Sequence, residues 1–356
     1  MVPAHGGRAV APVYRPILAS RRRGELEALT HLDPAAVPLI APILEVEAVD
    51  RSTRDGLRRL PVGLLPAVDV TAQPDSVDTE LVRWGVPLMP VIGLAESERR
   101  LVAHGAAARA YARRALVRVR AAHDRAGPDA DTTAVERIWR HTGLAPEECD
   151  LLVDAGDVCC PADVRVAEPR VRRLLDWARR HAWRSATVAA GGMPPTLSRL
   201  PIDEPVRLER WDWQLWQRLA DVGVDYGDYG VGSALPDSGD PGDRLPTVRY
   251  TADDGWWVYR WSRRGGRGDD RFADLCRTLV TAPHWSGVGA TFSWGDHELL
   301  RRARRGAGAG SAANWTAWST SHHVAHVLAA LLRPDDPGQS GWDSRPGPPQ
   351  RGRSPR

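Results

Sequence analysis

Asp150-Leu-Leu-Val-Asp-Ala-Gly-Asp157 is the segment on which the predicted fold is based. Its apolar run ends at Asp154, a pattern typical of a buried strand whose C-terminal end carries a carboxylate. Buried strands of this kind, separated by helical patterns, predict a parallel sheet that closes into a barrel with a polar mouth. The same pattern recurs at three other places: Ile43-Leu-Glu45, Ala67-Val-Asp69 and Leu116-Val-Arg-Val-Arg120.

Along the whole chain, eight segments have the pattern of a strand, and helical patterns separate them. The sequence therefore predicts the α/β class and a single-domain, TIM-like (β/α)8 barrel. A helix over 205–220, a hairpin around Asp253-Asp254-Gly255, a helix over 269–280 and a final helix over 321–332 are also expected. The candidate strands are 14–20, 38–46, 64–70, 87–94, 114–120, 150–157, 186–190 and 222–226.

Two assignments of the barrel strands fit the sequence. In the first, all eight candidates form the barrel, and residues 247–332 are an addition to it. In the second, Pro16 disqualifies the first candidate, and the segment 247–318 supplies the last strands. We prefer the second assignment, because strand-ending polar motifs continue as far as Trp294-Gly-Asp296.

Composition bounds the class of protein. The 356 residues are 42% hydrophobic, enough for one domain at 13–332, with a flexible leader at 1–12 and a disordered tail at 333–356. Net charge is +3, of which the tail's five Arg less three Asp supply +2, leaving about +1 for the domain. Nucleic-acid binding is therefore not expected, since it needs basic residues on the folded part. All the basic residues are Arg, which points to genomic base bias.

Cysteine usage and hydropathy point to a cytoplasmic protein. The four cysteines (149, 159, 160 and 276) form no CxxC pair and are expected to be reduced thiols. The N-terminal residues lack the apolar core of a signal peptide, and no apolar run is long enough to cross a bilayer, so we expect no membrane partner.

Carboxylates follow several predicted strands and are expected to meet at the barrel mouth, where such barrels keep their sites. Converging carboxylates bind Mg²⁺ or divide into a general acid and a general base. The alternative is that each one caps the next helix or forms a turn, as we expect for Asp157. The candidates are Glu45, Asp69, Asp154, Asp228 and Asp296.

Basic and glycine residues complement this acidic set. Arg118 and Arg120 face the same way on a strand, and with Arg249 they suit a clamp for phosphate or carboxylate. Alternatively, the first two pair internally with Glu45 or Asp154. Gly191-Gly192 follows a strand, where backbone amides suit a phosphate, although a tight turn before Pro194-Pro195 is the preferred explanation.

Histidines and tryptophans cluster late in the chain. His322 and His323 are expected at a helix N-terminus, pointing into the mouth as hydrogen-bond donors or a general base, with a structural role as the alternative. Tryptophan is over-represented, at 15 residues. We expect Trp213 and one of Trp256 or Trp257 to be exposed.

With these segments in place, the chain resembles the beta family of phage and bacterial proteins over about residues 14–330. The resemblance implies no established activity and no catalytic residues, and it suggests a phage or mobile-element context. It rests on the order of several short motifs: Tyr14-x-Pro-Ile-Leu18, Arg23-Gly-Glu25, Pro42-x-Leu-Glu-Val46, Leu151-Leu-x-Asp-x-Gly156, Trp183-Arg184, Tyr226-Gly-Asp-Tyr229, Arg249-Tyr250, Phe292-Ser-x-Gly-Asp296 and His322-His323.

Together these observations predict a mouth that binds a small anionic ligand, such as a nucleotide or phosphate ester. Whether the protein also hydrolyses that ligand, with or without Mg²⁺, is left open by the sequence. The proposed catalytic residues are Asp154, Asp228, His322 and His323. The competing hypothesis is a non-enzymatic interaction protein, whose protein partner would bind a Trp- and Arg-rich surface around 256–267. The proposed ligand-binding residues are Glu45, Asp69, Arg118, Arg120, Gly191, Gly192, Arg249 and Asp296.

Overall fold

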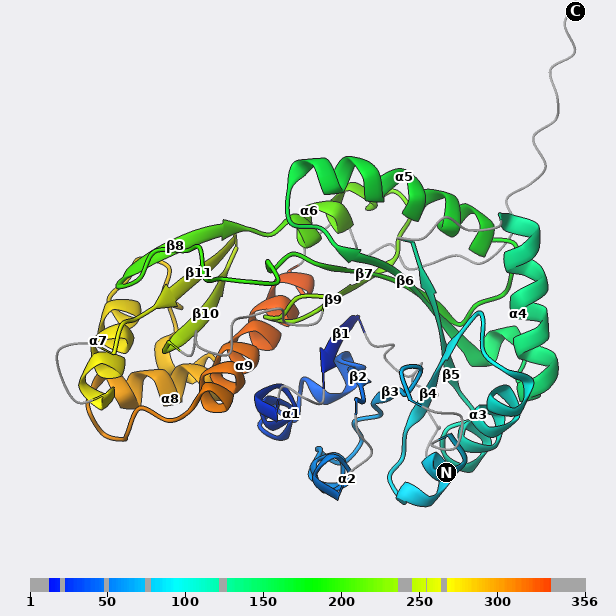
Figure 1. Cartoon of the computed structure of the whole chain (residues 1–356), viewed down its shortest axis with the longest axis horizontal. Coiled ribbons are helices and arrows are strands. Elements are labelled where there is room, and N and C mark those ends of the chain that lie inside the picture. The colour runs from blue at the N-terminus through cyan, green and yellow to red at the C-terminus, as the bar shows by residue number, and fades with distance from the viewer. Residues whose placement is uncertain are drawn as a thin grey trace, which may run out of the picture.

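The fold is a closed barrel of eight parallel strands, as the sequence predicts (Figure 1). The computed structural model describes residues 13–19, 23–47, 51–73, 78–121, 127–235, 245–253, 255–263 and 268–333, so the expected leader and the tail beyond Arg333 lie outside the described residues. The strands, in the order in which they pair around the barrel, are β1 (Tyr14–Ala19), β2 (Ile43–Glu45), β3 (Ala67–Asp69), β4 (Met89–Gly93), β5 (Ala115–Arg120), β6 (Cys149–Asp157), β7 (Ser185–Gly191) and β9 (Asp225–Asp228).

Helices surround this barrel, and the main hydrophobic core lies between the two layers. Strand β5 illustrates the division, because Val117 and Val119 join that outer core while Leu116 belongs to a separate cluster inside the barrel. Period-two alternation in each strand therefore separates an outward apolar face from an inward one. The helices are α1 (Arg23–Thr30), α2 (Arg51–Arg58), the 3₁₀ helix η2 (Asp78–Trp84), α3 (Glu98–Tyr111), α4 (Pro128–Thr142), α5 (Pro161–Ala178), α6 (Trp211–Arg218) and α9 (Ala312–Leu331).

A smaller unit lies beside the barrel, at the left of Figure 1. Its antiparallel sheet has the order β10-β11-β8, and its own core packs Tyr259, Phe272 and Trp318. The chain enters most of this unit after β9 and returns through α9, which packs against α1. A Cβ at Gly24 of α1 would lie 2.1 Å from the carbonyl oxygen of Ala313, so only glycine permits this approach. The elements are β8 (Glu204–Glu209), β10 (Thr247–Ala252), β11 (Gly255–Arg260), α7 (Gly268–Val280) and α8 (Trp294–Ala303).

The preferred strand assignment is wrong, and the first assignment is correct. Strand β1 exists and pairs with β9 through Tyr14–Pro16 and with β2 through Ile17–Ala19. Pro16 stands at the last position paired with β9, beside the point where pairing with β2 begins. Its missing amide therefore interrupts the ladder little. Residues 247–332 add the smaller unit and the last helix instead of barrel strands.

Two local predictions also need correction. The expected helix over 205–220 divides into strand β8, which pairs with β11, and the shorter helix α6. Leu208 and Leu215 satisfy a helical spacing, but Leu208 sits in the sheet opposite Trp256. The final helix begins at Ala312, well before the predicted residue 321. The hairpin is confirmed as β10 and β11, and the helix expected over 269–280 is α7.

Candidate functional site

Polar side chains occupy both ends of the barrel interior, and an apolar layer separates them. At the N-terminal ends of the strands, buried Arg15 contacts Asp150 and Ser185. The middle layer is a cluster that includes Ile17, Met89 and other apolar side chains. At the C-terminal ends, carboxylates and arginines surround an open cavity. The apolar layer closes that cavity from below, so ligands reach it only from the mouth.

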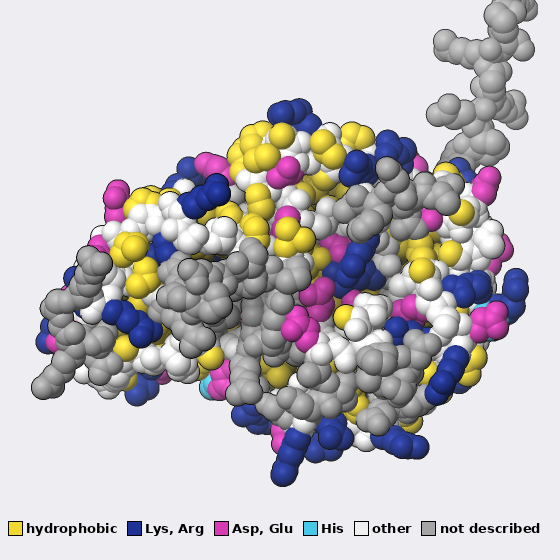
Figure 2. Space-filling view, in the orientation of Figure 1, with side chains coloured by type: hydrophobic (Ala, Val, Ile, Leu, Met, Phe, Trp, Pro, Cys, Tyr) yellow, Lys and Arg dark blue, Asp and Glu magenta, His cyan; other side chains and the backbone are white. Residues whose placement is uncertain are grey.

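The cavity at the mouth has a volume of about 540 Å³. In the space-filling view, acidic and basic side chains lie next to one another over the middle of the barrel (Figure 2). Five of the residues predicted from the sequence line this cavity: Glu45, Asp69, Arg118, Arg120 and Asp154. Its other lining residues are Val46, Glu47, Thr71, Ala72, Gly156, Asp157, Tyr229, Ala234 and Leu235.

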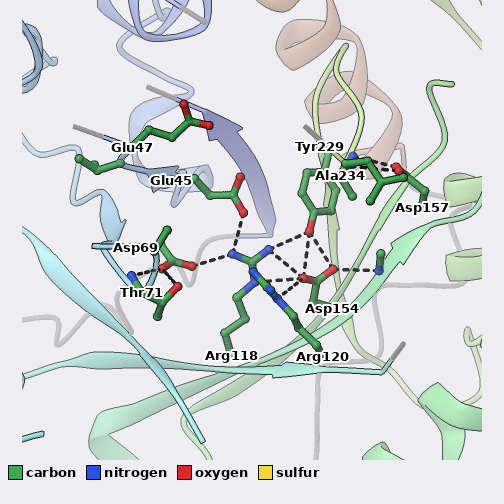
Figure 3. Close-up of a pocket in the computed structure, with 14 residues that line it drawn as sticks. Glu45, Glu47, Asp69, Thr71, Arg118, Arg120, Asp154, Asp157, Tyr229 and Ala234 are labelled. Atoms are coloured by element: carbon green, nitrogen blue, oxygen red, sulfur yellow. Dashed lines mark hydrogen bonds and ion pairs between the residues drawn. The ribbon is translucent and has the colours of Figure 1, made fainter. Parts of the chain in front are cut away.

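Arg118 is the centre of the polar network (Figure 3). Its Nη1 donates to Glu45 Oε1 at 2.8 Å and to Asp69 Oδ2 at 2.6 Å. Its Nε and Nη2 donate to Asp154 Oδ2 at 3.0 and 2.8 Å. Nη2 also donates to the Tyr229 hydroxyl at 2.7 Å, and that hydroxyl donates to Asp154. All three guanidinium nitrogens are therefore engaged within the protein.

Backbone groups hold the two buried carboxylates in place. Asp69 Oδ1 accepts hydrogen bonds from the amide and hydroxyl of Thr71, at 2.9 and 2.6 Å. Asp154 Oδ1 accepts from the Gly156 amide at 2.9 Å, and Gly156 has a φ of 70°. A glycine suits this position because other residues are strained at positive φ. The network is thus fixed before any ligand arrives.

Charge coupling determines the protonation state of this network. Burial raises the pKa of Asp69, but the Arg118 charge and the Thr71 hydrogen bonds lower it more, so the carboxyl pKa falls below its usual value. Burial alone lowers the pKa of Arg118, yet Asp154 and its other partners raise it well above normal. Burial and the Asp154 charge raise the pKa of Tyr229, so its hydroxyl stays protonated.

Glu45 and Arg120 are the most exposed charged groups of the network. The Glu45 side chain is 28% exposed and bonds Arg118 through Oε1; in the described part of the chain its Oε2 makes no bond. The Arg120 side chain is 56% exposed, and its Nε lies 3.7 Å from Asp154 Oδ2. These two groups have opposite charge and can change partners at little cost.

Tyr229 and Asp157 extend the site beyond the prediction. In β9, Asp225 and Gly227 occupy the inward register, so a period of two would have identified Tyr229 as an inward residue. Asp157, predicted as a turn residue, accepts hydrogen bonds from Ser233 Oγ and the amides of Ala234 and Leu235. It therefore fastens the segment after β9 to the rim of the cavity.

Asp228 and His323 lie outside the cavity, contrary to the prediction. Asp228 follows an inward residue on β9, so its side chain points outward to helix α9. There its Oδ2 bonds His323 Nε2 at 2.8 Å, and its Oδ1 accepts from the Tyr14 hydroxyl at 2.8 Å. Arg210 Nη2 lies 3.7 Å from Oδ2. Both residues are almost fully buried, so this pair connects the barrel to the last helix.

The outward cluster is also strongly polarised. Burial raises the pKa of Asp228, but His323 and then Arg210 together lower it by more than burial raises it, so the net shift is downward. Burial raises the pKa of Tyr14 well above its usual value, as does the Asp228 charge. His323 Nδ1 lies 2.8 Å from Thr251 Oγ1, which links the cluster to the smaller sheet. The expected position at a helix N-terminus is wrong, because His323 lies in the middle of α9.

Asp296, His322 and Arg249 belong to the smaller unit and its contact with α9. Asp296 follows no strand; it lies in α8, where it bonds His322 Nδ1 at 2.9 Å and accepts from the Tyr250 hydroxyl at 3.0 Å. His322 also lies mid-helix, and its Nε2 is 2.8 Å from the Thr251 carbonyl oxygen. The backbone amide of Arg249 bonds Ser319 Oγ, and the residue lies on β10, away from the mouth.

Gly191 and Gly192 do not line the cavity. A Cβ at Gly191 would lie 2.4 Å from Asp157 Oδ1, and one at Gly192 would lie 2.3 Å from Asp212 Oδ1. These glycines therefore allow carboxylates to pack close to the backbone. A phosphate bound at the same glycines would be repelled by these negative charges. Their role resembles the tight-turn alternative more than the phosphate cradle.

Metal and membrane features complete the description. Among the described residues, no group of three or more His, Cys, Asp or Glu side chains has the geometry to hold a metal ion. The four cysteines are free thiols. No helix in the same residues combines the length and the apolar character needed to cross a membrane.

Comparison with known proteins identifies the family but transfers no activity. Two solved structures resemble the chain: an alanine racemase from Clostridium difficile 630 (12% identity, TM-score 0.32, covering 51% of this chain and 47% of that one) and the biosynthetic arginine decarboxylase SpeA from Campylobacter jejuni (9%, 0.39, 90% and 56%). The chain thus spans about half the length of these proteins. No curated protein matches it. The sequence profile of the Beta protein family matches residues 14–329, and the chain therefore belongs to the Beta protein family.

Proposed function

We propose that the barrel cavity binds a small molecule that presents a cationic group to Glu45 and an anionic group to Arg120. The observation that carries this proposal is the saturation of Arg118, whose three guanidinium nitrogens all donate to protein oxygens. A ligand therefore meets the outer pair of charges, Glu45 Oε2 and the Arg120 guanidinium, before it meets the inner network.

The net charge of the cavity supports a cationic group on the ligand. Five carboxylates line it (Glu45, Glu47, Asp69, Asp154 and Asp157) against two guanidinium groups, so the lining charge is 2 − 5 = −3. A concave site with an excess of one charge concentrates ligands of the opposite charge. Val46, Ala72 and Leu235 add an apolar wall, which suits a ligand with a short hydrocarbon body.

This proposal revises the expectation of a nucleotide or phosphate ester. A phosphate dianion would have to displace carboxylates from Arg118 or bind at Arg120 beside several like charges. Hydrolysis is not included, because the Asp228–His323 pair predicted to move protons is buried on the outer face of β9. What the cavity supports best is binding of a zwitterion. The titration with MgCl₂ described below measures whether the cavity also binds Mg²⁺.

The test is calorimetric titration of the whole protein with arginine, ethanolamine phosphate, ATP, inorganic phosphate and MgCl₂. Zwitterions such as arginine are expected to bind, and Glu45→Gln and Arg120→Gln should each weaken binding about tenfold. Glu147→Gln is the matched control, since it removes an exposed carboxylate near the start of β6. Binding of ATP or phosphate alone, or equal binding by Glu45→Gln and wild type, would overturn the proposal.

The alternative of an interaction protein gains no support from the aromatic surface that it requires. Trp256 and Trp261 are buried, and Trp257 is half-buried and stacks on His284 with ring centroids 4.2 Å apart. Trp213, the other predicted exposed ring, is also only half-buried. Residues 264–267 lie outside the described residues. A phage or mobile-element context remains a prediction from the family resemblance.

A further inference from the structure

A second cavity of about 530 Å³ lies on the outside of the barrel. Its walls come from helix α6, the end of β8 and the tip of the β10–β11 hairpin at Asp253. It shares no lining residue with the cavity at the barrel mouth. It is therefore a separate place at which the protein can hold a ligand.

Arg210 forms the inner wall of this second cavity and has donors to spare. It is only 3% exposed, and the hydrogen bonds that it makes, to Asp212 and to the Tyr226 hydroxyl, all come from Nη2. Its Nε is buried without a hydrogen-bond partner. In the described part of the chain Nη1 donates no hydrogen bond. A buried guanidinium with unused donors is costly, and a ligand hydroxyl would remove that cost.

The remaining walls offer both donors and acceptors with no net charge. Gln214 and Gln217, three residues apart on α6, each carry an amide that donates and accepts. Arg210 and Arg218 balance Glu209 and Asp253, so the lining charge is 2 − 2 = 0. Both carboxylates already have basic neighbours, because Glu209 pairs with Arg207 at 2.7 Å and Asp253 with Arg333 at 3.0 Å.

An aromatic ring lies among these polar groups. Trp213 is half-buried, lines the cavity, and has the Arg210 guanidinium 5.1 Å from its ring centroid. A half-buried indole offers an apolar contact in an otherwise polar cavity. A matching ligand is uncharged, has groups that both donate and accept, and carries an apolar C–H surface.

We propose that this cavity binds a neutral carbohydrate, with sugar hydroxyls on Arg210, Gln217 and Asp253 and the C–H surface of the ring on Trp213. Hydroxyl groups both donate and accept, so they satisfy guanidinium, amide and carboxylate partners together. A phosphorylated ligand fits less well, because Glu209 and Asp253 would face its charge.

The test is saturation-transfer NMR, followed by calorimetric titration, of the whole protein with glucose, galactose, N-acetylglucosamine and glucose 6-phosphate. At least one neutral sugar should bind at millimolar concentration, and Gln217→Ala and Asp253→Ala should each weaken it about tenfold. Both side chains are exposed, so both variants should fold, which circular dichroism checks. Glu147→Gln and Glu45→Gln should bind the sugar as wild type does.

Three results would overturn the proposal. One is that no neutral sugar binds. Another is that glucose 6-phosphate binds while the neutral sugars do not. The third is equal sugar binding by wild type, Gln217→Ala and Asp253→Ala. Because Glu45→Gln affects only the barrel mouth, failure here is distinguishable from failure of the function proposed for that site.

Discussion

Replacing Arg118 by Met removes the buried cation that pairs with two buried carboxylates. Asp69 and Asp154 are 4% and 2% exposed, and both accept hydrogen bonds from Arg118. Removal of one partner from a buried ion pair costs about 3–5 kcal/mol, since the remaining charge stays buried. We expect Arg118→Met to lower the free energy of unfolding by about this amount at pH 7.5.

The pH dependence of this loss distinguishes a charge effect from a packing effect. In wild type the pKa of Asp69 is lowered, so its contribution to stability is present above its usual pKa and lost as pH falls through the folded value. In the variant, the Arg118 charge no longer opposes burial and only the Thr71 hydrogen bonds do, so the pKa of Asp69 rises above its wild-type value. The carboxyl then protonates at mildly acidic pH, and the stability difference between variant and wild type should shrink near pH 5.

The assay is urea unfolding at both pH values, followed by tryptophan fluorescence and circular dichroism. Arg120→Met is the matched control, because it removes the same charge two residues along β5 from a side chain that is 56% exposed. It should cost less than about 1 kcal/mol. A loss below 1 kcal/mol in Arg118→Met, or an equal loss at both pH values, would refute the reasoning.

Four further predictions follow from the contacts of single residues. Tyr229→Phe should cost about 1–3 kcal/mol in urea unfolding, because the variant loses the hydrogen bond that the hydroxyl accepts from Arg118 and the one that it donates to Asp154. Unchanged stability would contradict the role of Tyr229 in the network. Asp228→Asn should cost about 3–5 kcal/mol, because it removes a buried counter-charge of Arg210 and the carboxylate that bonds His323. Equal stability of the two proteins would refute this role. Gly192→Ala should cost about 1–3 kcal/mol, because the added Cβ would lie 2.3 Å from Asp212 Oδ1. Thermal melts measure this loss, and an unchanged melting temperature would contradict the prediction. Burial lowers the pKa of His326 to about 2, so the histidine protonates in the unfolded chain before it does in the folded protein. The free energy of unfolding of wild type should therefore fall by about 1.4 kcal/mol between pH 7.5 and 5.5. In urea unfolding at these two pH values, His326→Gln should lack this part of the acid sensitivity.

The sequence predicted the barrel because the strands are short and apolar, several of them end in charge, and helical patterns separate them. β6 and β5 were located almost to the residue, and the carboxylates at the ends of β2, β3 and β6 do meet around Arg118. The positions of these carboxylates at the strand ends were enough to predict that they meet, because parallel strands put their C-terminal ends at one edge.

Some of the errors at the site share one physical origin, which is the face of a strand on which a residue lies. Asp228 is the last residue of β9 and Tyr229 follows it, yet one side chain points to helix α9 and the other into the cavity. A shift of one residue exchanges these faces, and the Tyr226-Gly-Asp-Tyr229 motif gives no independent register. Leu208 shows the same ambiguity between helical and strand spacing, which only the partner strand β11 resolves.

The position of α9 has a consequence for how the chain folds. The last strand of the barrel, β9, ends at Asp228, but the helix that packs against α1 and β9 begins only at Ala312, after the smaller unit. During synthesis, all eight strands leave the ribosome long before the helix that covers their seam. The seam between β1 and β9 therefore stays uncovered, with the Asp228 carboxylate still lacking its histidine, until more than eighty further residues have been made. We expect the docking of α9 on this seam to be the slow step of folding, and we expect the smaller unit to form before α9 can dock.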